Sequence, residues 1–525
     1  MNRLKYIFFC LLLLAGFSTG YSQKSTTASS ADKIIITSSS PVNPVLKRQD
    51  ANPLLRIKIF LPAGKASINY QRIHFSLNEQ GVKAIDKVQV FFNNGEPLFS
   101  VKNNIASVEP ANKIFSIPVD FTVKQGWNYI WLSATLKENA DIDNKIELHA
   151  TKLTDAANKT HFIAEQKGNY IKYSGIALRK AWDDSVHSYR IPGITTTDKG
   201  TLISVYDIRY KHSGDLPANI DVGMNRSTDG GKTWEPMKNI MDMGAPHENN
   251  GVGDPAILFD PIAKKIWVAA LWSKGNRSIA GSEPGLSPDT TGQFVLISSD
   301  DDGLTWSQPV SITAQVKNPA WHLYFNGPGN GIAMQNGTLV FASQYWDESK
   351  KPGMPHSSII YSDDHGKTWK SGVGAKSNTT EAQVVETTPG TLMLNMRDNR
   401  GNYRSVATTK DMGANWTEHQ TSYNALADPV CMASIIKAKV KVKGVMKDVL
   451  FFSNVNSSTA RINMTIKASL DLGETWLPAN QLLLDERRSF GYSALTRIDE
   501  NTIGIIYEGS RDLYFVRVLV KDIIK

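Results

Sequence analysis

An arginine followed by an apolar residue and a proline, Arg190-Ile191-Pro192, is the first group in this 525-residue chain that could do chemistry. A guanidinium stays charged and can bind a carboxylate through two charge-assisted hydrogen bonds. Two acidic stretches come next, Tyr206-Asp207-Ile208-Arg209 and Gly214-Asp215-Leu216-Pro217, and a carboxyl group can exchange a proton with a ligand. The tripeptide is common in proteins, so it indicates a site only in combination with motifs further along the chain.

An eight-residue motif, Ser-x-Asp-x-Gly-x-Thr-Trp, recurs after this arginine. Complete copies span residues 227–234, 299–306, 362–369 and 469–476, and a fifth copy at 409–416 has Asn415 in place of the Thr. The Asp can accept backbone hydrogen bonds within its own turn, the Gly can adopt positive φ, and the Trp can pack against a sheet. We therefore interpret these aspartate boxes as structural. Successive box aspartates are 72, 63, 47 and 60 residues apart, about one four-stranded sheet with its loops, which predicts the blades of a β-propeller over residues 175–525.

Residues 53–165 show a different all-β pattern. Short runs alternate between apolar and polar residues, as at Val88-Gln89-Val90, and Asn93-Asn94-Gly95 has the composition of a hairpin turn. This period of two predicts a small β-sandwich, and long amphipathic helical patterns are missing. Exposed aromatic residues on such a sandwich could bind carbohydrate, but aromatic residues at alternate positions more often pack in a core. Carbohydrate binding by this accessory domain stays open.

The N-terminus has the pattern of a secretory signal peptide. Arg3 and Lys5 precede an apolar run from Ile7 to Phe17, and small residues come after it, which predicts a signal peptide over residues 1–22. We expect export to the periplasm or the medium, and no membrane insertion of the mature protein. Residues 23–52 are rich in Ser, Thr, Asn and Pro, and their composition predicts a flexible leader.

Composition excludes several classes of function. Cys431 would be the one cysteine left after processing, so no internal disulfide is expected. The formal net charge is +8, but Lys and Arg form no stripe of the kind that nucleic-acid surfaces need. The ten histidines show no metal-binding spacing and no Gly-rich phosphate loop comes after a strand, so neither a metal nor another cofactor is predicted.

The Arg-Ile-Pro motif followed by repeated aspartate boxes resembles the sialidases (neuraminidases) of the bacterial exo-sialidase family, which also includes trans-sialidases. The resemblance runs from about Gly175 to Lys525. It implies a propeller of six blades with its active site at the pseudo-symmetry axis and its boxes on peripheral turns. The family's substrate carries a carboxylate on the anomeric carbon of sialic acid, which three arginines bind.

The resemblance assigns these binding residues by their motifs. The arginine triad corresponds to Arg190, to Arg397 in Asn395-Met396-Arg397-Asp398, and to Arg461 in Thr459-Ala460-Arg461-Ile462. Three further positions resemble an arginine that contacts the far hydroxyl of the sugar, a pocket aspartate, and a carboxylate that braces the first arginine: Arg209, Asp254 and Glu508. A brace has a physical reason, because clustered arginines repel one another.

A tyrosine is the expected nucleophile. A carboxylate that approached a carbon already bearing a carboxylate would meet like-charge repulsion, and sialidases are the tyrosine exception among retaining glycosidases. Tyr492, in Phe490-Gly491-Tyr492-Ser493, occupies the family's late tyrosine position. Its hydroxyl needs a base. Glu381 matches that partner, with Glu386 as a competitor five residues later.

Asp215 is the expected acid/base, because it lies on a Gly/Pro-flanked loop 25 residues after Arg190, with Asp207 and Asp221 as nearby alternatives. The chain is thus predicted to be an exo-α-sialidase that acts on sialylated glycoproteins, glycolipids and oligosaccharides with retention of configuration. A trans-sialidase, including an intramolecular one, would share these residues. A non-catalytic glycan-binding propeller is the alternative from another class. Oligomeric state is not predicted.

Overall fold

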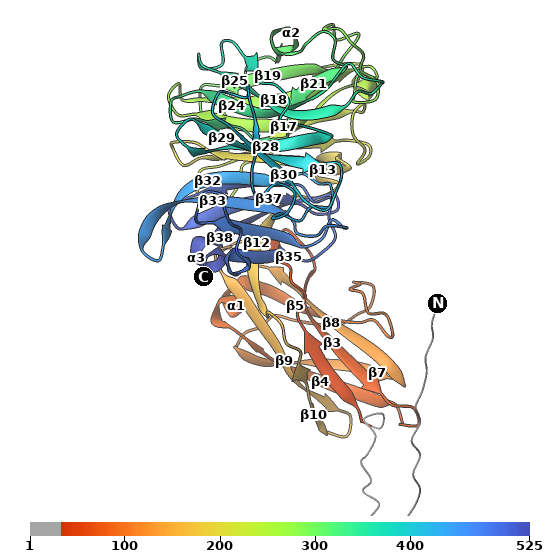
Figure 1. The fold of residues 1–525 in the computed structure, drawn as a ribbon. Helices are drawn as coiled ribbons and strands as arrows, with labels where there is room; N and C mark the ends of the chain where they lie inside the picture. The colour runs from red at the N-terminus through yellow and green to blue at the C-terminus, as the bar shows by residue number, and fades with distance from the viewer. Residues whose placement is uncertain (1–32) are drawn as a thin grey trace, which may run out of the picture.

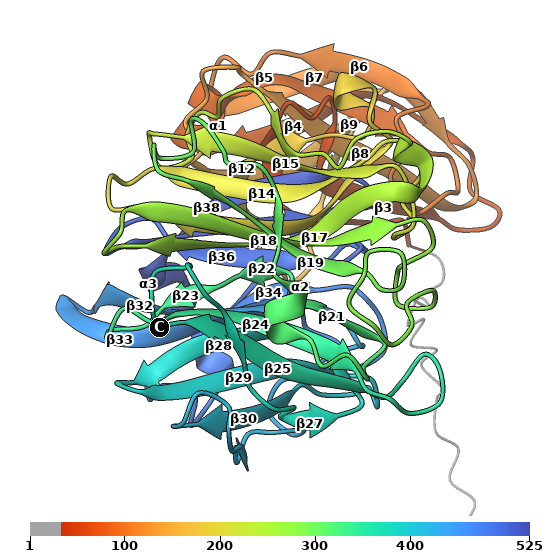
Figure 2. The same cartoon turned by 90° about the horizontal axis from the view of Figure 1, so that it is seen from above.

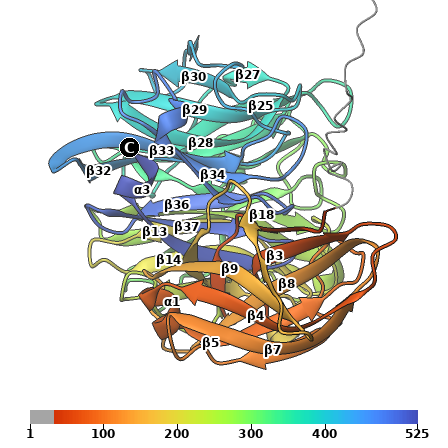
Figure 3. The same cartoon turned by 90° about the horizontal axis from the view of Figure 1, so that it is seen from below.

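The computed structural model describes residues 33–525 as two β-domains. Figure 1 shows a sandwich, coloured red to orange, beside a larger propeller coloured yellow to blue. In the views from above and below, the sandwich lies on one side of the propeller and β30 on the opposite side (Figures 2 and 3). The predicted signal peptide, residues 1–22, lies outside the described residues.

The sandwich is formed by two sheets that enclose a core of aliphatic and aromatic side chains. One sheet has the order β11 (Ala164–Glu165), β1 (Ile35–Ser39), β3 (Asn52–Leu61), β8 (Gly126–Leu136), β5 (Ile85–Phe92) and β6 (Asn104–Val108). The other contains β9 (Lys145–Asp155), β4 (Ile68–Leu77), β7 (Ile114–Val123) and β10 (Thr160–Phe162), with the short helix α1 (Glu79–Ala84) before β5. Alternate residues such as Val88 and Val90 are fully buried, as the period of two predicts.

The prediction of a flexible leader over residues 23–52 is wrong for residues 35–52. Strand β1 pairs antiparallel with β3, and β2 (Val45–Lys47) pairs in parallel with β12 (Ile171–Arg179). Val45 and Leu46 are fully buried. The polar composition did not indicate these short strands, because they are stabilised by pairing with long partner strands and not by an alternating apolar pattern of their own.

The propeller has six blades around one axis, each antiparallel in its main strands. The first blade contains β13 (Ser188–Thr196), β14 (Leu202–Arg209), β15 (Ile220–Ser227) and β16 (Lys238–Met241). The second contains β17 (Asn250–Asp260), β18 (Lys265–Lys274), β19 (Gln293–Ser299) and β20 (Val310–Ser311), with β22 (Gly329–Asn330) beside β17. The third contains β21 (Leu323–Asn326), β23 (Ile332–Ala333), β24 (Leu339–Trp346), β25 (Pro355–Ser362), β26 (Lys370–Ser371) and β27 (Lys376–Ser377).

The fourth blade contains β28 (Thr379–Thr388), β29 (Thr391–Asp398), β30 (Ser405–Thr409) and β31 (Thr417–Glu418). The fifth contains β32 (Ser434–Val442), β33 (Val445–Val455), β34 (Met464–Ser469) and β35 (Gln481–Asp485). The sixth contains β36 (Ser493–Arg497), β37 (Thr502–Glu508), β38 (Leu513–Leu519) and β12. Strand β12 comes from the beginning of the propeller and completes the last blade, so it closes the ring. The all-β fold class, a propeller preceded by a sandwich, is confirmed.

Strand β12 also joins the two domains. Its first half pairs with β9 of the sandwich and its second half with β38 of the propeller. Ion pairs cross the same boundary, including Lys145 with Asp522 at 2.7 Å and Arg517 with Asp143 at 2.6 Å. The remaining α-helices are α2 (Thr313–Val316) and α3 (Val520–Ile523), and within residues 33–525 no helix is both long and apolar enough to cross a membrane.

Each aspartate box forms the turn after the third strand of its blade. In the second blade, Asp301 accepts the backbone N–H of Thr305 at 2.8 Å and the Thr305 hydroxyl at 2.6 Å. In the fifth copy of the motif, the Asn415 side chain replaces the Thr hydroxyl and donates to Asp411 at 2.8 Å. The boxes therefore hold peripheral turns together, as their residue types predict.

Candidate active site

The predicted site residues converge on one face of the propeller. Arg190 lies near the start of the innermost strand β13, and Arg397 lies near the end of the second strand β29. Because these strands are antiparallel within a blade, the start of a first strand and the end of a second strand meet at the same edge. All nine predicted residues come from this edge or its loops: Arg190, Arg209, Asp215, Asp254, Glu381, Arg397, Arg461, Tyr492 and Glu508.

A cavity of about 390 Å³ opens at this face. Five of the predicted residues line it, namely Asp215, Asp254, Glu381, Arg397 and Tyr492. The other four, Arg190, Arg209, Arg461 and Glu508, contact these five or the loops that carry them.

Tyr492 is hydrogen-bonded in the way that a tyrosine nucleophile requires. Its hydroxyl donates to Oε1 of Glu381, and Arg397 Nη1 lies 2.6 Å from Oε2 of Glu381 and 3.0 Å from the Tyr492 oxygen. Burial and then the Glu381 charge raise the pKa of Tyr492 well above its ordinary value, although Arg397 opposes them. The free protein thus holds a neutral phenol against a base and a cation.

Glu386, the competitor of Glu381, lies elsewhere. Its carboxylate accepts the backbone N–H groups of Gln335 and Gly390, both at 2.9 Å, near the far end of β28. It caps the turn to β29 there. The geometry therefore brings Glu381, and not Glu386, to Tyr492.

Glu508 is a fully buried carboxylate that connects two parts of the site. It accepts hydrogen bonds from Arg190 Nε at 3.2 Å and from the backbone N–H of Ile191 at 2.9 Å. It also accepts the backbone N–H of Tyr492 at 2.9 Å. A single carboxylate thus neutralises the first arginine and fixes the loop that carries the tyrosine.

Arg461 lies beside Tyr492, with its guanidinium carbon 5.9 Å from the centre of the tyrosine ring. Its Nη1 donates to the carbonyl of Phe490 at 2.7 Å and its Nη2 to the carbonyl of Val430 at 3.1 Å. The Phe490 ring lies 4.4 Å from the guanidinium carbon of Arg190. Phe490 therefore contacts two of the three arginines, a role that sequence reasoning missed although this residue lies two positions before Tyr492.

Asp215 projects into the cavity with 78% of its side chain exposed. It accepts from Arg209 at 2.6 Å and from Arg190 at 3.4 Å. The surrounding protein partly desolvates this carboxyl group and would raise the pKa of Asp215, but the charge and hydrogen bond of Arg209 outweigh this effect and lower the pKa below its ordinary value. The free protein therefore holds Asp215 as a carboxylate.

The two alternatives to Asp215 have other partners. Asp207 is fully buried and is bonded to Arg209 and to the backbone N–H of Asp254. Asp221 accepts from the Tyr210 hydroxyl at 2.9 Å and from Asn239 at 2.7 Å, and it does not line the cavity. Of these three aspartates, Asp215 is the one that lines the cavity.

Asp254 lies on the cavity wall with a positive φ of 57°. Burial, followed by repulsion from Asp207 and Asp215, raises its pKa well above the ordinary value, and the Arg209 charge opposes this. A neutral carboxyl group at this position can donate a hydrogen bond to a ligand hydroxyl.

Part of the cavity lining is apolar and was not predicted. It includes Leu271, Ile279, Ala280, Phe325 and Trp346. Most of these residues lie on strands or beside them and look like core residues in the sequence. No local pattern separates them from a core, because only the closure of the ring brings them to the cavity.

Comparison with known proteins identifies the family of this chain. Residues 31–159 match the family described as the N-terminal domain of BNR-repeat neuraminidase, and residues 189–505 match a BNR repeat-like domain. The chain is 46% identical to a sialidase of Bacteroides fragilis over 437 residues, which cover 82% of this chain and 79% of that protein. It is 34% identical to a sialidase of Micromonospora viridifaciens over 328 residues, covering 61% of this chain and 50% of that protein.

Solved structures give the same result. The structure titled Hadza microbial sialidase Hz136 has a TM-score of 0.85 and 39% identity, and the match covers 93% of this chain and all of that one. An intramolecular trans-sialidase from Ruminococcus gnavus has a TM-score of 0.57 at 18% identity over 65% of this chain and 96% of that one, which shows a shared fold alone. The chain belongs to the bacterial sialidase (neuraminidase) family and is a glycoside hydrolase of the exo-α-sialidase class.

Proposed function

We propose that this enzyme hydrolyses terminal sialic acid from glycoproteins, glycolipids and oligosaccharides with retention of configuration, through a covalent bond to Tyr492. The observation that carries the proposal is the contact of the Tyr492 hydroxyl with Glu381 and Arg397 inside the cavity. A phenol is a weak nucleophile until a base removes its proton. We propose that Glu381 removes this proton and that Arg397 stabilises the charge that develops on the oxygen.

The arginines give the substrate its orientation. We propose that Arg190, Arg397 and Arg461 bind the sialic acid carboxylate, with charge-assisted hydrogen bonds of about 1.5–3 kcal/mol each. Arg397 supports this, because it lines the cavity and its hydrogen bonds to Glu381 and Tyr492 both use Nη1 of its guanidinium.

The reaction then proceeds in two steps. Tyr492 attacks the anomeric carbon as Glu381 takes its proton, and Asp215 protonates the glycosidic oxygen while that C–O bond breaks. Water then attacks the same carbon, Asp215 takes the proton of the water, and the Tyr492 oxygen leaves and regains its proton from Glu381. Two inversions at one carbon give net retention.

Asp215 must be protonated when the leaving group departs, although it is a carboxylate in the free enzyme. Binding of the substrate carboxylate offsets the positive charge of Arg190 and Arg397, which are among the groups that lower the pKa of Asp215. The substrate thus raises the pKa of its own acid catalyst. Arg209 and Asp254 are proposed to bind hydroxyl groups of the sugar, and Glu508 to brace Arg190.

The test uses an aryl α-sialoside that releases a fluorescent phenol. We expect turnover by wild type and a loss of several orders of magnitude in Tyr492→Phe, with an unchanged Tm. Tyr361→Phe is the matched control, because Tyr361 lies on β25 outside the cavity. An inactive but folded wild type would support a glycan-binding propeller, and full activity in Tyr492→Phe would exclude this nucleophile.

Product analysis separates hydrolysis from transfer. Proton NMR of the first product should show the α-anomer of free sialic acid, which then mutarotates. A trans-sialidase would form a new sialoside when lactose is added, and an intramolecular enzyme would release an anhydro sugar. If either of these products exceeded free sialic acid, transfer and not hydrolysis would be the main reaction of the enzyme.

We also propose that the enzyme is exported by the signal peptide over residues 1–22. The support is the apolar run from Ile7 to Phe17 after two basic residues. Sequencing the N-terminus of protein secreted by its host would test this. A mature protein that begins at Met1 would exclude cleavage.

A further inference from the structure

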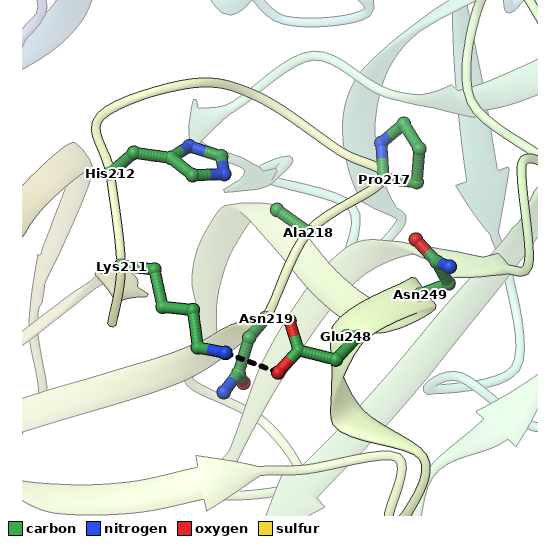
Figure 4. Close-up of a pocket in the computed structure, with 7 residues that line it drawn as sticks. All are labelled: Lys211, His212, Pro217, Ala218, Asn219, Glu248 and Asn249. Carbon is green, nitrogen blue, oxygen red and sulfur yellow. Dashed lines mark hydrogen bonds and ion pairs between the residues drawn. The ribbon is translucent and has the colours of Figure 1, made fainter.

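A second, polar pocket lies beside the catalytic loop. It has a volume of about 340 Å³ and is lined by Lys211, His212, Pro217, Ala218, Asn219, Glu248 and Asn249. Figure 4 shows these side chains around the hollow, with the ion pair between Lys211 and Glu248 at one side. None of the nine predicted site residues lines this pocket.

The pocket and the catalytic cavity share one loop, residues 210–219. Asp215 and Leu216 of this loop line the cavity, whereas Pro217 and Ala218 line the pocket. The loop packs tightly on β17, since a Cβ added at Gly251 would lie 2.2 Å from the Ala218 carbonyl oxygen. The two hollows are therefore separated by the thickness of this loop.

The position of Asp215 determines what can reach the pocket. If Asp215 protonates the glycosidic oxygen, the leaving sugar must start next to Asp215. The pocket begins at Pro217, two residues along the same loop from Asp215, where the sugars that follow the leaving one can reach it.

The pocket has the chemistry of a site for a neutral sugar. Lys211 and Glu248 are paired with each other, so neither of these two charges is left unpaired to attract an ion. The side-chain amides of Asn219 and Asn249 line the pocket, and each amide can donate to and accept from hydroxyl groups. Pro217 and Ala218 offer a small apolar surface for the C–H face of a ring. A volume near the lower end of the ~300–1,000 Å³ of small-molecule sites suits one or two sugar rings.

We infer that this pocket is a glycan subsite, which binds a neutral pyranose of the glycan from which sialic acid is removed. The inference rests on the proposed function, because it requires Asp215 to face the leaving group. It gives the enzyme a preference for oligosaccharides over sialosides with a small non-sugar leaving group.

The test compares two substrates, sialyllactose and an aryl α-sialoside, in the full-length enzyme. The variants are Asn249→Ala, Lys211→Ala and the double variant Asn219→Ala with Asn249→Ala. Loss of one hydrogen bond to a sugar hydroxyl lowers kcat/KM about three- to tenfold. We expect each single variant to lower kcat/KM for sialyllactose about three- to tenfold more than it lowers kcat/KM for the aryl sialoside. For the double variant, we expect this difference to be about tenfold or more.

Lys441→Ala is the matched control for Lys211→Ala. It also breaks an exposed Lys–Glu pair, with Glu500, but at the other end of the strands. We expect this control variant to leave kcat/KM unchanged for both substrates. Free lactose should inhibit wild type more strongly than the double variant.

Two results would overturn the subsite. Equal losses on both substrates would show that these residues support the catalytic loop and bind no sugar. Unchanged kinetics on both substrates, with unchanged inhibition by lactose, would show an unoccupied surface pocket. A wild type that hydrolyses neither substrate would overturn the proposed function itself, which is a distinct outcome.

Discussion

The backbone N–H of Tyr492 donates a hydrogen bond of 2.9 Å to Oε2 of Glu508, while Oε1 of the same carboxylate accepts from Arg190 and from the backbone of Ile191. Tyr492, the proposed nucleophile, and Arg190 therefore have a common, fully buried support. This relationship makes the position of the tyrosine dependent on a side chain that does not line the cavity.

Glu508→Gln tests this support. The side-chain amide of glutamine has an NH₂ group in place of one carboxylate oxygen, and an NH₂ group accepts no hydrogen bond. At least one of the donors on Tyr492, Ile191 and Arg190 therefore loses its acceptor. The buried positive charge of Arg190 also loses the negative charge that neutralised it. We expect about 3–5 kcal/mol less stability, measured by urea unfolding, and a fall in kcat/KM of about 10–100-fold. Glu486→Gln, an exposed change on a nearby loop, is the control. Normal kinetics in a folded Glu508→Gln would contradict the common support.

Substrate binding should change the titration of Asp215. In the free enzyme, Arg209 holds the pKa of Asp215 below its ordinary value, and the substrate carboxylate is expected to raise it by offsetting Arg190 and Arg397. The protonated acid is lost as pH rises through its pKa. Since kcat/KM reports the free enzyme and kcat the complex, the alkaline decline of kcat should lie at higher pH than that of kcat/KM.

Measurements on sialyllactose, whose leaving sugar needs a proton, would show this difference. Asp215→Asn should remove the alkaline decline and lower kcat by about 10²–10⁴-fold on sialyllactose. A smaller loss is expected on an aryl sialoside, because a phenol leaves with less help. Declines of kcat and kcat/KM at the same pH would argue against a substrate-assisted shift.

Local motifs were sufficient to predict polar residues that the fold brings together, whereas their roles stay predictions. Arg190 is marked by the nearby proline of its motif, and Tyr492 and Glu381 lie in short segments that match the family pattern. The apolar part of the cavity lining could not be found in this way. Phe325 and Trp346 have the sequence environment of core strands, and their exposure to the cavity depends on how the blades close into a ring.

The N-terminal segment shows the opposite error. Its Ser, Thr and Pro content suggested a leader, but β1 and β2 are strands of five and three residues that pair with long neighbours. Leu46 belongs to the same buried cluster as Tyr492 and Cys431. Composition describes a segment in isolation, whereas this segment is stabilised by the domain against which it folds.

Leu46→Ala should therefore destabilise the enzyme. A fully buried leucine that is truncated to alanine loses about 2–5 kcal/mol, because transfer energy is lost and a cavity remains. Urea unfolding would measure the loss. Leu304→Ala, at a side chain that is half exposed, should change stability by less than about 0.5 kcal/mol. Equal stabilities of the two variants would mean that residues 45–47 behave as a leader in solution.

The aspartate boxes make a prediction about acid stability. The hydroxyl and backbone N–H of Thr305, and then the Ser299 hydroxyl, lower the pKa of Asp301 from 3.8 to about 2 although partial burial opposes them. A group whose pKa is lower in the folded state contributes stability that is fully present above 3.8 and is lost as pH falls towards 2. Asp301→Ala should lower the Tm by about 2–4 °C at pH 7, and this difference should shrink as pH falls through that window.

Asp300→Ala is the adjacent control, since Asp300 is exposed and pairs only with Lys265 among the described residues. Turnover of the aryl sialoside at 25 °C should be normal in both variants, because the box forms a peripheral turn. A loss of turnover in Asp301→Ala without a change in Tm would give the boxes a part in catalysis and contradict their structural interpretation.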